Sequence, residues 1–273
     1  MNENEEAENR QRLRSPLVYE IVRREAEVEL ERPLRSLWWS GVAAGIALSS
    51  SLLAEGLLRH YLPDVQWRPV VESFGYCVGF LIVILARLQL FTEQTVTAVI
   101  PLFADFSRRN LLRTARLWSV VLMANLVGTA VTAAVTIFLG TIQPEHLPAL
   151  LEVSREFAGL SAGQAMIYGV PAGFFIAAIV WMLPNVEGAE FFVIIIVTWL
   201  IAIGGFAHVI VGSSEVFMLQ FSGELGLVDG FFGLILPSLA GNIIGGTGLF
   251  AMLACAGTGS VVMPGSIDNS SCT

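Results

Sequence analysis

Residues 74–103, FGYCVGFLIVILARLQLFTEQTVTAVIPLF, form an apolar stretch with a polar interruption in its middle. The first apolar piece, residues 74–88, is shorter than the about 20 residues that a helix needs to cross the hydrocarbon of a bilayer. It holds Arg87 near its end, and the polar residues 89–94 and a second short apolar piece, residues 96–103, follow it. This pattern predicts a membrane helix that breaks and resumes as a half-helix.

Residues 191–221, FFVIIIVTWLIAIGGFAHVIVGSSEVFMLQF, show the same pattern further along the chain. The apolar run contains His208 and is interrupted by Gly-Ser-Ser-Glu at residues 212–215. Each interruption holds a hydroxyl side chain followed by an acid, Thr92-Glu93 in the first and Ser214-Glu215 in the second. Because such residues are typical of helix N-termini, we expect a half-helix to begin at each interruption.

Four further apolar segments are long enough to span a bilayer without a break. They are residues 38–58, 117–139, 165–183 and 231–253. With the two interrupted segments they predict an all-α integral membrane protein with six transmembrane helices, of which helices 2 and 5 are broken near the midplane. We expect a cytoplasmic polar tail with an amphipathic helix over residues 1–36, a six-helix domain over residues 37–256, and a short cytoplasmic tail over residues 257–273.

The composition agrees with this prediction. Of the 273 residues, 55% are hydrophobic and 14% are charged, and the mean hydropathy is +0.70. Soluble domains carry about 25% charged residues. The net charge of −8 mainly reflects a solvated tail, because nine acids and seven arginines precede Trp38. Nucleic-acid binding needs a basic face, so the charge pattern argues against it.

The residue patterns that most enzymes and cofactor proteins need are missing. All 15 basic residues are arginine, which excludes a P-loop, a Schiff-base site and a lysine general base. The three cysteines have no CxxC spacing, and the three histidines are far apart in the sequence. No HExxH, GxSxG or dinucleotide-binding motif stands in a suitable context. We therefore expect no enzyme activity, no cofactor, no metal site and no ATP-driven transport by this chain alone.

The arginines indicate the orientation in the membrane. Eleven lie in the N-terminal segment and in residues 102–116, on one predicted side, whereas only Arg59, Arg68 and Arg155 lie on the other. The positive-inside rule then places both termini in the cytoplasm. The acidic start of the chain is the opposite of a signal peptide. The amphipathic stretch 16–31 either lies on the cytoplasmic membrane face or caps the bundle as a solvated helix, and the sequence leaves both open.

The six segments fall into two halves with the same layout, a full helix, a broken helix and a full helix. Thr92 and His208 hold similar places in these halves, 116 residues apart. Three crossings are an odd number, so the second half must enter from the opposite side as a 3+3 inverted repeat. Broken segments at matching places in inverted halves indicate a transport site near the midplane.

Backbone hydrogen bonding explains why such breaks matter. An irregular segment at membrane depth leaves N–H and C=O groups unpaired unless protein or a water-filled cavity surrounds it. Each half-helix would also direct its free N–H groups and the positive end of its dipole toward the centre. This arrangement favours anions or polar neutral solutes over cations.

Three short motifs occur in order along the predicted spans. They are Leu90-Phe91-Thr92, Gly205-Phe206-Ala207-His208 and Gly241-Asn242-Ile243-Ile244-Gly245-Gly246. Together they resemble the formate/nitrite transporter family over residues 38–253. The resemblance implies an aquaporin-like subunit with its own pore, assembled as a homopentamer in a prokaryotic cytoplasmic (inner) membrane. It also implies small monovalent anions as substrates, among them formate, nitrite, hydrosulfide and lactate, which some members couple to protons.

The resemblance also implies roles for individual residues. Thr92, His208 and Asn242 would be the central polar residues of the pore. Constriction residues would be Leu90, Phe91, Phe80, Tyr76, Ile176 and Ile201. The chain departs from the family pattern at several positions, and it therefore looks like a divergent branch that does not simply inherit a formate assignment. These positions are Phe157, where the family often has a vestibule lysine, Gly173, where it often has an asparagine, Gln89, Ala207 and Arg87.

Two residues have alternative interpretations. His208 either ties two helices together or, as we favour, binds an anion with Thr92 and transiently protonates it. A lone guanidinium at membrane depth costs about 2.5–3.5 kcal/mol on insertion scales. Arg87 is therefore expected to pair with Glu93 or Glu215, or to face a vestibule and concentrate anions there.

The leading hypothesis is a channel or transporter for small monovalent anions, with proton coupling through the central histidine as an option. A pore for neutral solutes is one alternative, although the Asn-Pro-Ala signature of aquaporins is absent from both interruptions. The other alternative is a non-transporting or sensor-like member of the same fold.

Overall fold

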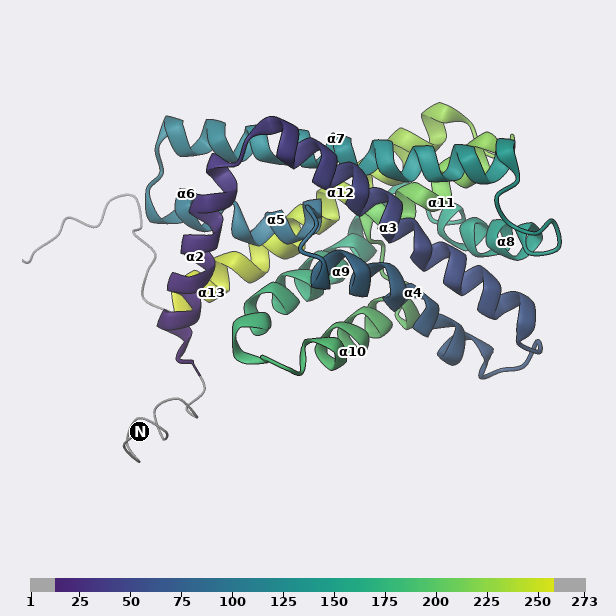
Figure 1. Ribbon diagram of the computed structural model, residues 1–273, viewed down its shortest axis with the longest axis horizontal. Coiled ribbons are helices and arrows are strands. Elements are labelled where there is room, and N and C mark those ends of the chain that lie inside the picture. The colour runs from purple at the N-terminus through teal and green to yellow at the C-terminus, as the bar shows by residue number, and fades with distance from the viewer. Residues whose placement is uncertain (1–12, 258–273) are drawn as a thin grey trace, which may run out of the picture.

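The computed structural model describes residues 13–257, and all regular structure within this range is helical (Figure 1). The final helix, Asp229–Gly257, is continuous but contains two π-helical stretches, η2 and η3. In chain order the elements are α2 (Ser15–Glu31), α3 (Leu34–Tyr61), α4 (Arg68–Leu85), α5 (Phe91–Thr97), α6 (Ile100–Ala104), α7 (Arg108–Leu139), α8 (Leu147–Ala158), α9 (Ala162–Met182), η1 (Leu183–Asn185), α10 (Glu190–Ile203), α11 (Val209–Phe221), η2 (Asp229–Ile235), α12 (Leu236–Ile243), η3 (Ile244–Ala251) and α13 (Met252–Gly257).

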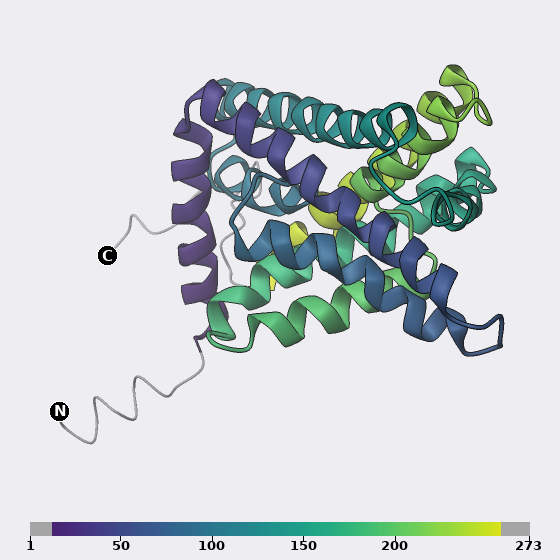
Figure 2. The same ribbon diagram turned by 45° about the vertical axis from the view of Figure 1, so that its right-hand side comes forward.

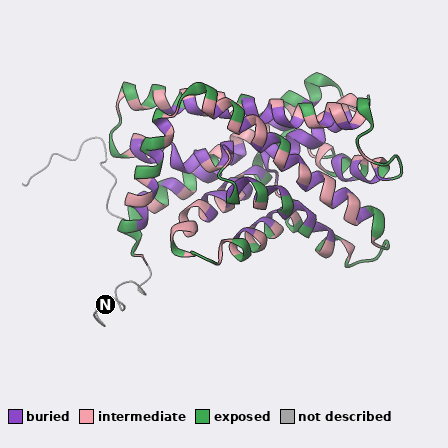
Figure 3. Ribbon diagram, in the orientation of Figure 1, coloured by how far each residue is buried: buried purple, intermediate pink, exposed green. Residues whose placement is uncertain are grey.

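Five helices within the described range are long and apolar enough to cross a membrane. They are α3, α4, α7, α9 with η1, and the final helix, while α10 and α11 are apolar but shorter. Buried residues gather toward the middle of the bundle (Figure 3). The outward faces are apolar as well, since Phe192 and Ile196 on α10 are each 64% exposed. An apolar exterior over apolar helices is what a lipid environment requires.

The first interruption lies slightly earlier than predicted. α4 ends at Leu85 and α5 begins at Phe91, so residues 86–90 are the non-helical segment. Thr92 and Glu93 are the second and third residues of the half-helix, so Thr92 is not its N-cap. Leu90 precedes it in an extended conformation and makes no side-chain cap. The continuation is also bent, because α5 ends at Thr97 and α6 follows after a two-residue turn.

The second interruption is not where the sequence predicted it. Residues 204–208 are non-helical, and residues 212–215 lie inside α11. Gly205, with φ of +62°, ends α10 in the left-handed conformation that glycine adopts readily. The hydroxyls of Ser213 and Ser214 bond back to the carbonyls of Ile210 and Val211, both at 2.7 Å. These local bonds satisfy the serines, so they continue the helix instead of capping a new one.

Glycines allow two helix pairs to approach closely. α3 packs against α7, and α9 packs against α12. A Cβ atom on Gly45 would collide with the carbonyl oxygen of Asn125, and one on Gly173 would collide with that of Asn242. Both glycines belong to the small-xxx-small spacing that permits close helix contact in membranes.

Helix α2 lies across one end of the bundle (Figure 2). Its buried residues Val18 and Val22 join a cluster with Val99 and Ile100 from the region of α6. The other face carries ion pairs, and hydrogen bonds from Arg23 and Arg24 lower the pKa of Glu20 to about 2. Of the two sequence interpretations, the structure therefore favours the helix that caps the bundle.

Alanine at the close-packed glycines should destabilise the fold. We expect Gly45→Ala and Gly173→Ala each to cost about 1–3 kcal/mol, because the new methyl overpacks a backbone contact. Gly248→Ala is the matched control. Apart from its chain neighbours and the backbone of its own helix, no atom lies within 4 Å of a Cβ added at Gly248. Thermal unfolding in detergent, followed by the loss of monodisperse protein, measures the difference. Equal midpoints for all three variants would contradict the packing argument.

Candidate functional site

Thr92 and His208 meet at the centre of the bundle. Thr92 Oγ1 lies 2.8 Å from His208 Nε2, and both side chains are buried. In Figure 1, α5 runs from the middle of the molecule toward α2, and α11 runs from the middle toward α8. The two half-helices thus extend in opposite directions from this contact.

The hydrogen bonds of His208 identify its tautomer. Its Nδ1 accepts a bond from the backbone N–H of Val211 at 3.3 Å, so His208 is the N-cap of α11. A ring nitrogen that accepts a bond carries no proton, and the proton of the neutral ring is therefore on Nε2. His208 donates this proton to Thr92, whose own hydroxyl proton remains available to another acceptor. Protonation of Nδ1 would remove the helix cap.

Asn242 holds the second interruption in place. Its Oδ1 accepts from the N–H of Val209 at 2.9 Å. Its amide group donates to the carbonyls of Gly169 and Ala207, at 2.9 and 2.8 Å. Asn242 is fully buried and lines neither of the two cavities described below. The structure thus places it at the second interruption, where it pairs backbone groups.

Asn125 does the same for the first interruption, and the sequence analysis missed it. Its Oδ1 accepts from the N–H of Phe91 at 2.9 Å, and its amide donates to the carbonyls of Gly41 and Gln89, both at 2.8 Å. An asparagine in the middle of a charge-free apolar span is a signal that could have identified it, because polar residues inside membranes are rarely without a role.

These matched bonds correct the expected correspondence between the halves. Phe91 is equivalent to Val209, so His208 is equivalent to Leu90, two residues before Thr92. Only His208 of this pair can cap a helix with its side chain. The first amide of each half-helix is already bonded to an asparagine, and the side chains of Thr92 and His208 add donors where the two half-helices meet.

The predicted constriction residues are buried, and one of them contacts His208. Phe80, Leu90, Ile176 and Ile201 are completely buried, and Phe91 is 1% exposed. The edge of the Phe80 ring meets the His208 ring with 5.0 Å between centroids. All five belong to one apolar cluster and line neither cavity, whereas Tyr76 lines one of them. Together they form a buried apolar region beside His208, which we call the dry layer.

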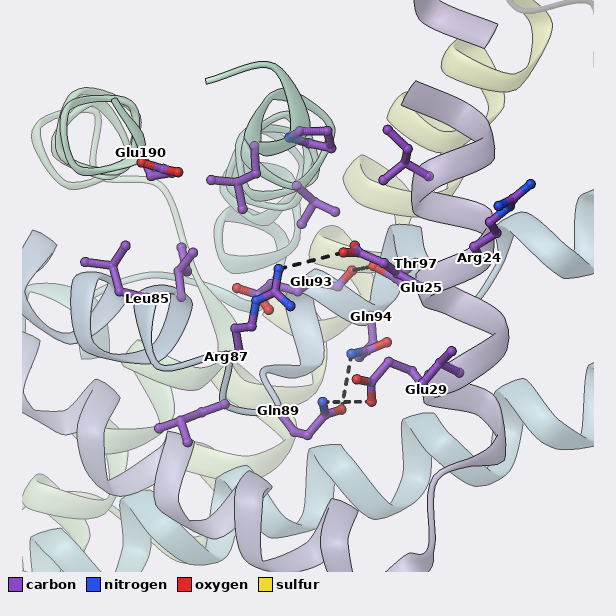
Figure 4. Close-up of a pocket in the computed structure, with 17 residues that line it drawn as sticks. Arg24, Glu25, Glu29, Leu85, Arg87, Gln89, Glu93, Gln94, Thr97 and Glu190 are labelled. Atoms are coloured by element: carbon purple, nitrogen blue, oxygen red, sulfur yellow. Dashed lines mark hydrogen bonds and ion pairs between the residues drawn. The ribbon is translucent and has the colours of Figure 1, made fainter. Parts of the chain in front are cut away.

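The first cavity, which we call the α2 cavity, lies between α2, the α4–α5 junction and η1 and has a volume of about 630 Å³ (Figure 4). Arg87 and the half-buried Glu93 line it together with residues of α2. Four glutamates and two arginines carry its charge, namely Glu25, Glu29, Glu93, Glu190, Arg24 and Arg87. Its walls are therefore acidic on balance.

Arg87 does not form the intramembrane pair that the sequence suggested. Its Nη2 lies 3.9 Å from Glu25, its side chain is 88% exposed, and within the described range it makes no ion pair with Glu93 or Glu215. Glu93 lines the same cavity, but Glu215 lines the other one. The reason is that α4 ends before Arg87, whose φ of +51° turns the side chain out of the bundle.

The second cavity, which we call the α8 cavity, lies between α3, α4, α8 and α11 and has a volume of about 330 Å³. His208 reaches its wall, and Glu55, Tyr76 and Glu215 line it as well. Glu156 is the third glutamate there, and no arginine lines the cavity. The sequence analysis did not place Glu55 in the site, although an acid inside a predicted span is a signal of function.

The departures from the family pattern lie in different places, since Phe157 lines the α8 cavity whereas Arg87 and Gln89 line the α2 cavity. The Phe157 ring packs against Gly212 and leaves no room for a Cβ there. Arg155 binds both carboxylate oxygens of Glu224, at 2.7 and 2.8 Å, which lowers the pKa of Glu224. Arg155 is thus held outside the α8 cavity. Among residues 13–257, no group of three or more His, Cys, Asp or Glu side chains is placed to hold a metal ion.

Removing either asparagine should destabilise the protein by a similar amount. Asn125→Leu and Asn242→Leu each leave one N–H and two C=O groups unpaired, and a buried unpaired group costs about 1–3 kcal/mol. Asn110→Ala is the control, because its side chain bonds only at the surface, to Asp105 and Arg113. Thermal unfolding in detergent tests this. A leucine variant as stable as the control would show that the bonds do not hold the interruptions.

The comparisons with known proteins agree on one family. The sequence profile described as "Formate/nitrite transporter" matches residues 16–256. The inner membrane protein YfdC of Escherichia coli (strain K12) is 39% identical over 249 residues, which cover 91% of this chain and 80% of that protein. The uncharacterized transporter YrhG of Bacillus subtilis (strain 168) is 24% identical over 229 residues, 80% of this chain and 83% of that protein.

Solved structures share the fold at low sequence identity. A structure titled "FNT family ion channel" has a TM-score of 0.74 and 18% identity, and covers 88% of this chain and 97% of that one. A "Pentameric formate channel with formate bound" has a TM-score of 0.68 and 18% identity, and covers 80% of this chain and 94% of that one. With the profile match over most of its length, the chain belongs to the formate/nitrite transporter family.

Proposed function

We propose that this chain is a channel or transporter for small monovalent anions. Family membership and the solved formate channel of the same fold support this function. The observation that carries it is the Thr92–His208 contact beside the dry layer, which we place between the two cavities. A solute that passes between the cavities meets two hydrogen-bond donors there.

We propose the following binding step. An anion that separates Thr92 from His208 accepts one bond from Nε2–H and one from the threonine hydroxyl. The protein loses one hydrogen bond and the complex gains two, both of the stronger charge-assisted kind. The surrounding apolar residues exclude water, which strengthens the hydrogen bond from each donor.

We also propose the remaining features of the family for this chain. α10 and α11 together would form the sixth crossing, and the matched bonds of Asn125 and Asn242 support two halves in a 3+3 inverted repeat. A homopentamer is proposed by analogy with the pentameric formate channel. Location in a prokaryotic inner membrane follows the description of YfdC, with both termini cytoplasmic by the arginine distribution.

Proton coupling through His208 is part of this proposal. The role of His208 as the cap of α11 limits which of its ring nitrogens can take part. The ring already carries its proton on Nε2, and a second proton on Nδ1 would displace the bond from Val211. His208 is therefore better placed to donate a hydrogen bond to an anion than to hold an additional proton.

The charge of the cavities favours a second candidate, a pore for neutral solutes. Glutamates outnumber arginines in the α2 cavity, and the α8 cavity contains glutamates and no arginine. Such walls repel anions and do not affect neutral molecules. A non-transporting or sensor-like protein is the outcome that remains if no solute crosses.

A flux panel in proteoliposomes distinguishes these functions. We expect formate or nitrite flux that depends on charge and pH, and a loss of about tenfold in His208→Asn and in Thr92→Val, since one donor bond is worth roughly 1.4 kcal/mol. Asparagine caps helices well, so His208→Asn keeps α11 capped, while its shorter side chain no longer places a donor at the position of Nε2. Thr132→Val is the control, because Thr132 bonds only within α7. Flux of glycerol but not of anions would favour the neutral pore.

Arg87→Gln tests whether the α2 cavity concentrates anions. We expect anion flux to fall about two- to threefold at low ionic strength and to match wild type at high salt, because an exposed charge is screened. Arg113→Gln is the control, since Arg113 pairs with Glu31 and does not line the cavity. Unchanged flux at low salt would remove the proposed role of Arg87.

A further inference from the structure

The α8 cavity brings together two buried carboxyl groups from opposite halves of the chain. Glu55 comes from α3 and is 8% exposed, and Glu215 comes from α11 and is 7% exposed. The charge of Glu215 acts on Glu55. Both line the cavity beside His208, on the α8 side of the dry layer.

Neither carboxyl group has a partner within the described residues. No hydrogen bond or ion pair connects Glu55 or Glu215 to residues 13–257, although both are more than nine-tenths buried. Tyr76 lines the same cavity, and its hydroxyl is buried and has no hydrogen-bond partner in that range either. Buried polar groups are normally paired. Three unpaired polar side chains on one cavity therefore indicate a ligand.

Arg59, the arginine whose charge acts on Glu55, is paired with other glutamates. Arg59 Nη2 lies 2.5 Å from Glu72 and 2.7 Å from Glu156, and Arg59 does not line the cavity. Glu72 and Glu156 add negative charge near Glu55. An unpaired carboxylate in such surroundings is unfavourable, and it is relieved by taking up a proton. Two carboxyl groups that face one cavity can share one proton for the same reason.

The other elements packed around the pair place no additional cation on the cavity wall, because Arg68 of α4 pairs with Asp64 and Glu72 and Arg155 of α8 pairs with Glu224. Tyr76 of α4, Glu156 of α8 and Tyr168 of α9 line the wall, whereas Glu72 of α4 and Glu152 of α8 do not. The predicted span of α7, residues 117–139, has no titratable side chain. The final helix, which also packs on α11, begins with Asp229. His208 is neutral as capped.

We propose that Glu55 and Glu215, with Tyr76, form a proton-holding site that protonates a weak-acid anion in the α8 cavity before it reaches Thr92 and His208. This rests on the proposed function. The O–H bond of the glutamic acid breaks, its oxygen keeps the electron pair, and a new O–H bond forms on the anion. The glutamate then recovers a proton from water on the α8 side.

The site explains how an acidic cavity serves an anion pore. A neutral acid is not repelled by Glu156 and crosses the dry layer without the penalty of an unpaired charge. It can still accept hydrogen bonds from Nε2–H of His208 and from Thr92. The proton is held by the carboxyl pair, so His208 keeps its cap throughout.

Two measurements test the proposal. The first is infrared difference spectroscopy of the purified protein, which detects a protonated carboxyl group without any transport. We expect its band near neutral pH in wild type and in the control Glu152→Gln, whose side chain is outside the cavity wall. The band should be lost or shifted in Glu55→Gln and in Glu215→Gln. Absence of the band in wild type would overturn the proposal.

The second measurement is formate flux together with internal pH in proteoliposomes, between about pH 5 and pH 8. In wild type and in Glu152→Gln, we expect protons to move together with formate. In the double variant Glu55→Gln/Glu215→Gln, we expect this proton movement to be at least tenfold smaller. If the wild type carries formate and the double variant keeps its proton movement, the proton site is wrong and the anion pore stands. If the wild type carries no anion, the proposed function fails, and the infrared band alone then decides whether the carboxyl pair holds a proton.

Discussion

Every backbone polar group inside an apolar bundle must be paired, and the centre of this protein depends on how that is done at two interruptions. Asn125 and Asn242 each accept one N–H at the start of a half-helix and donate to two carbonyls, one of them on a neighbouring helix. Gly45 and Gly173 allow the asparagine backbones to approach closely enough. Because these contacts hold both half-helix starts, Thr92 and His208 are brought together at 2.8 Å.

The dry layer and the two cavities differ in charge. The dry layer contains hydrogen-bond donors and no charged side chain, so it suits a solute that arrives neutral or that is held by both donors. The two cavities are acidic. An anion can pass acidic entrances only if its charge is neutralised before it reaches the dry layer. Among the described residues, the carboxyl pair of the α8 cavity offers a proton for that step.

Sequence reasoning was most accurate where a pattern has a single physical cause. Apolar length predicted the long helices, and the motifs carried the family. It failed at residues 212–215, because Ser213 and Ser214 bond within their own helix and a serine pair alone does not show this. Of its two alternatives for Arg87, the pair with Glu93 or Glu215 is wrong, because the depth of the residue depends on where α4 ends. It missed Asn125 and Glu55, whose partners or neighbours are far away in the chain.

The sequence by itself determined that the chain enters a membrane, that two of its apolar segments are interrupted, and that Thr92 and His208 belong to the interrupted segments, because hydropathy and local helix signals act over short distances. Only the tertiary structure decided the positions of the interruptions, the tautomer of His208, and the gathering of Glu55, Tyr76 and Glu215 in one cavity. These features depend on contacts between α3, α4, α7, α11 and α12, and no local pattern records a contact between residues that are far apart in the chain.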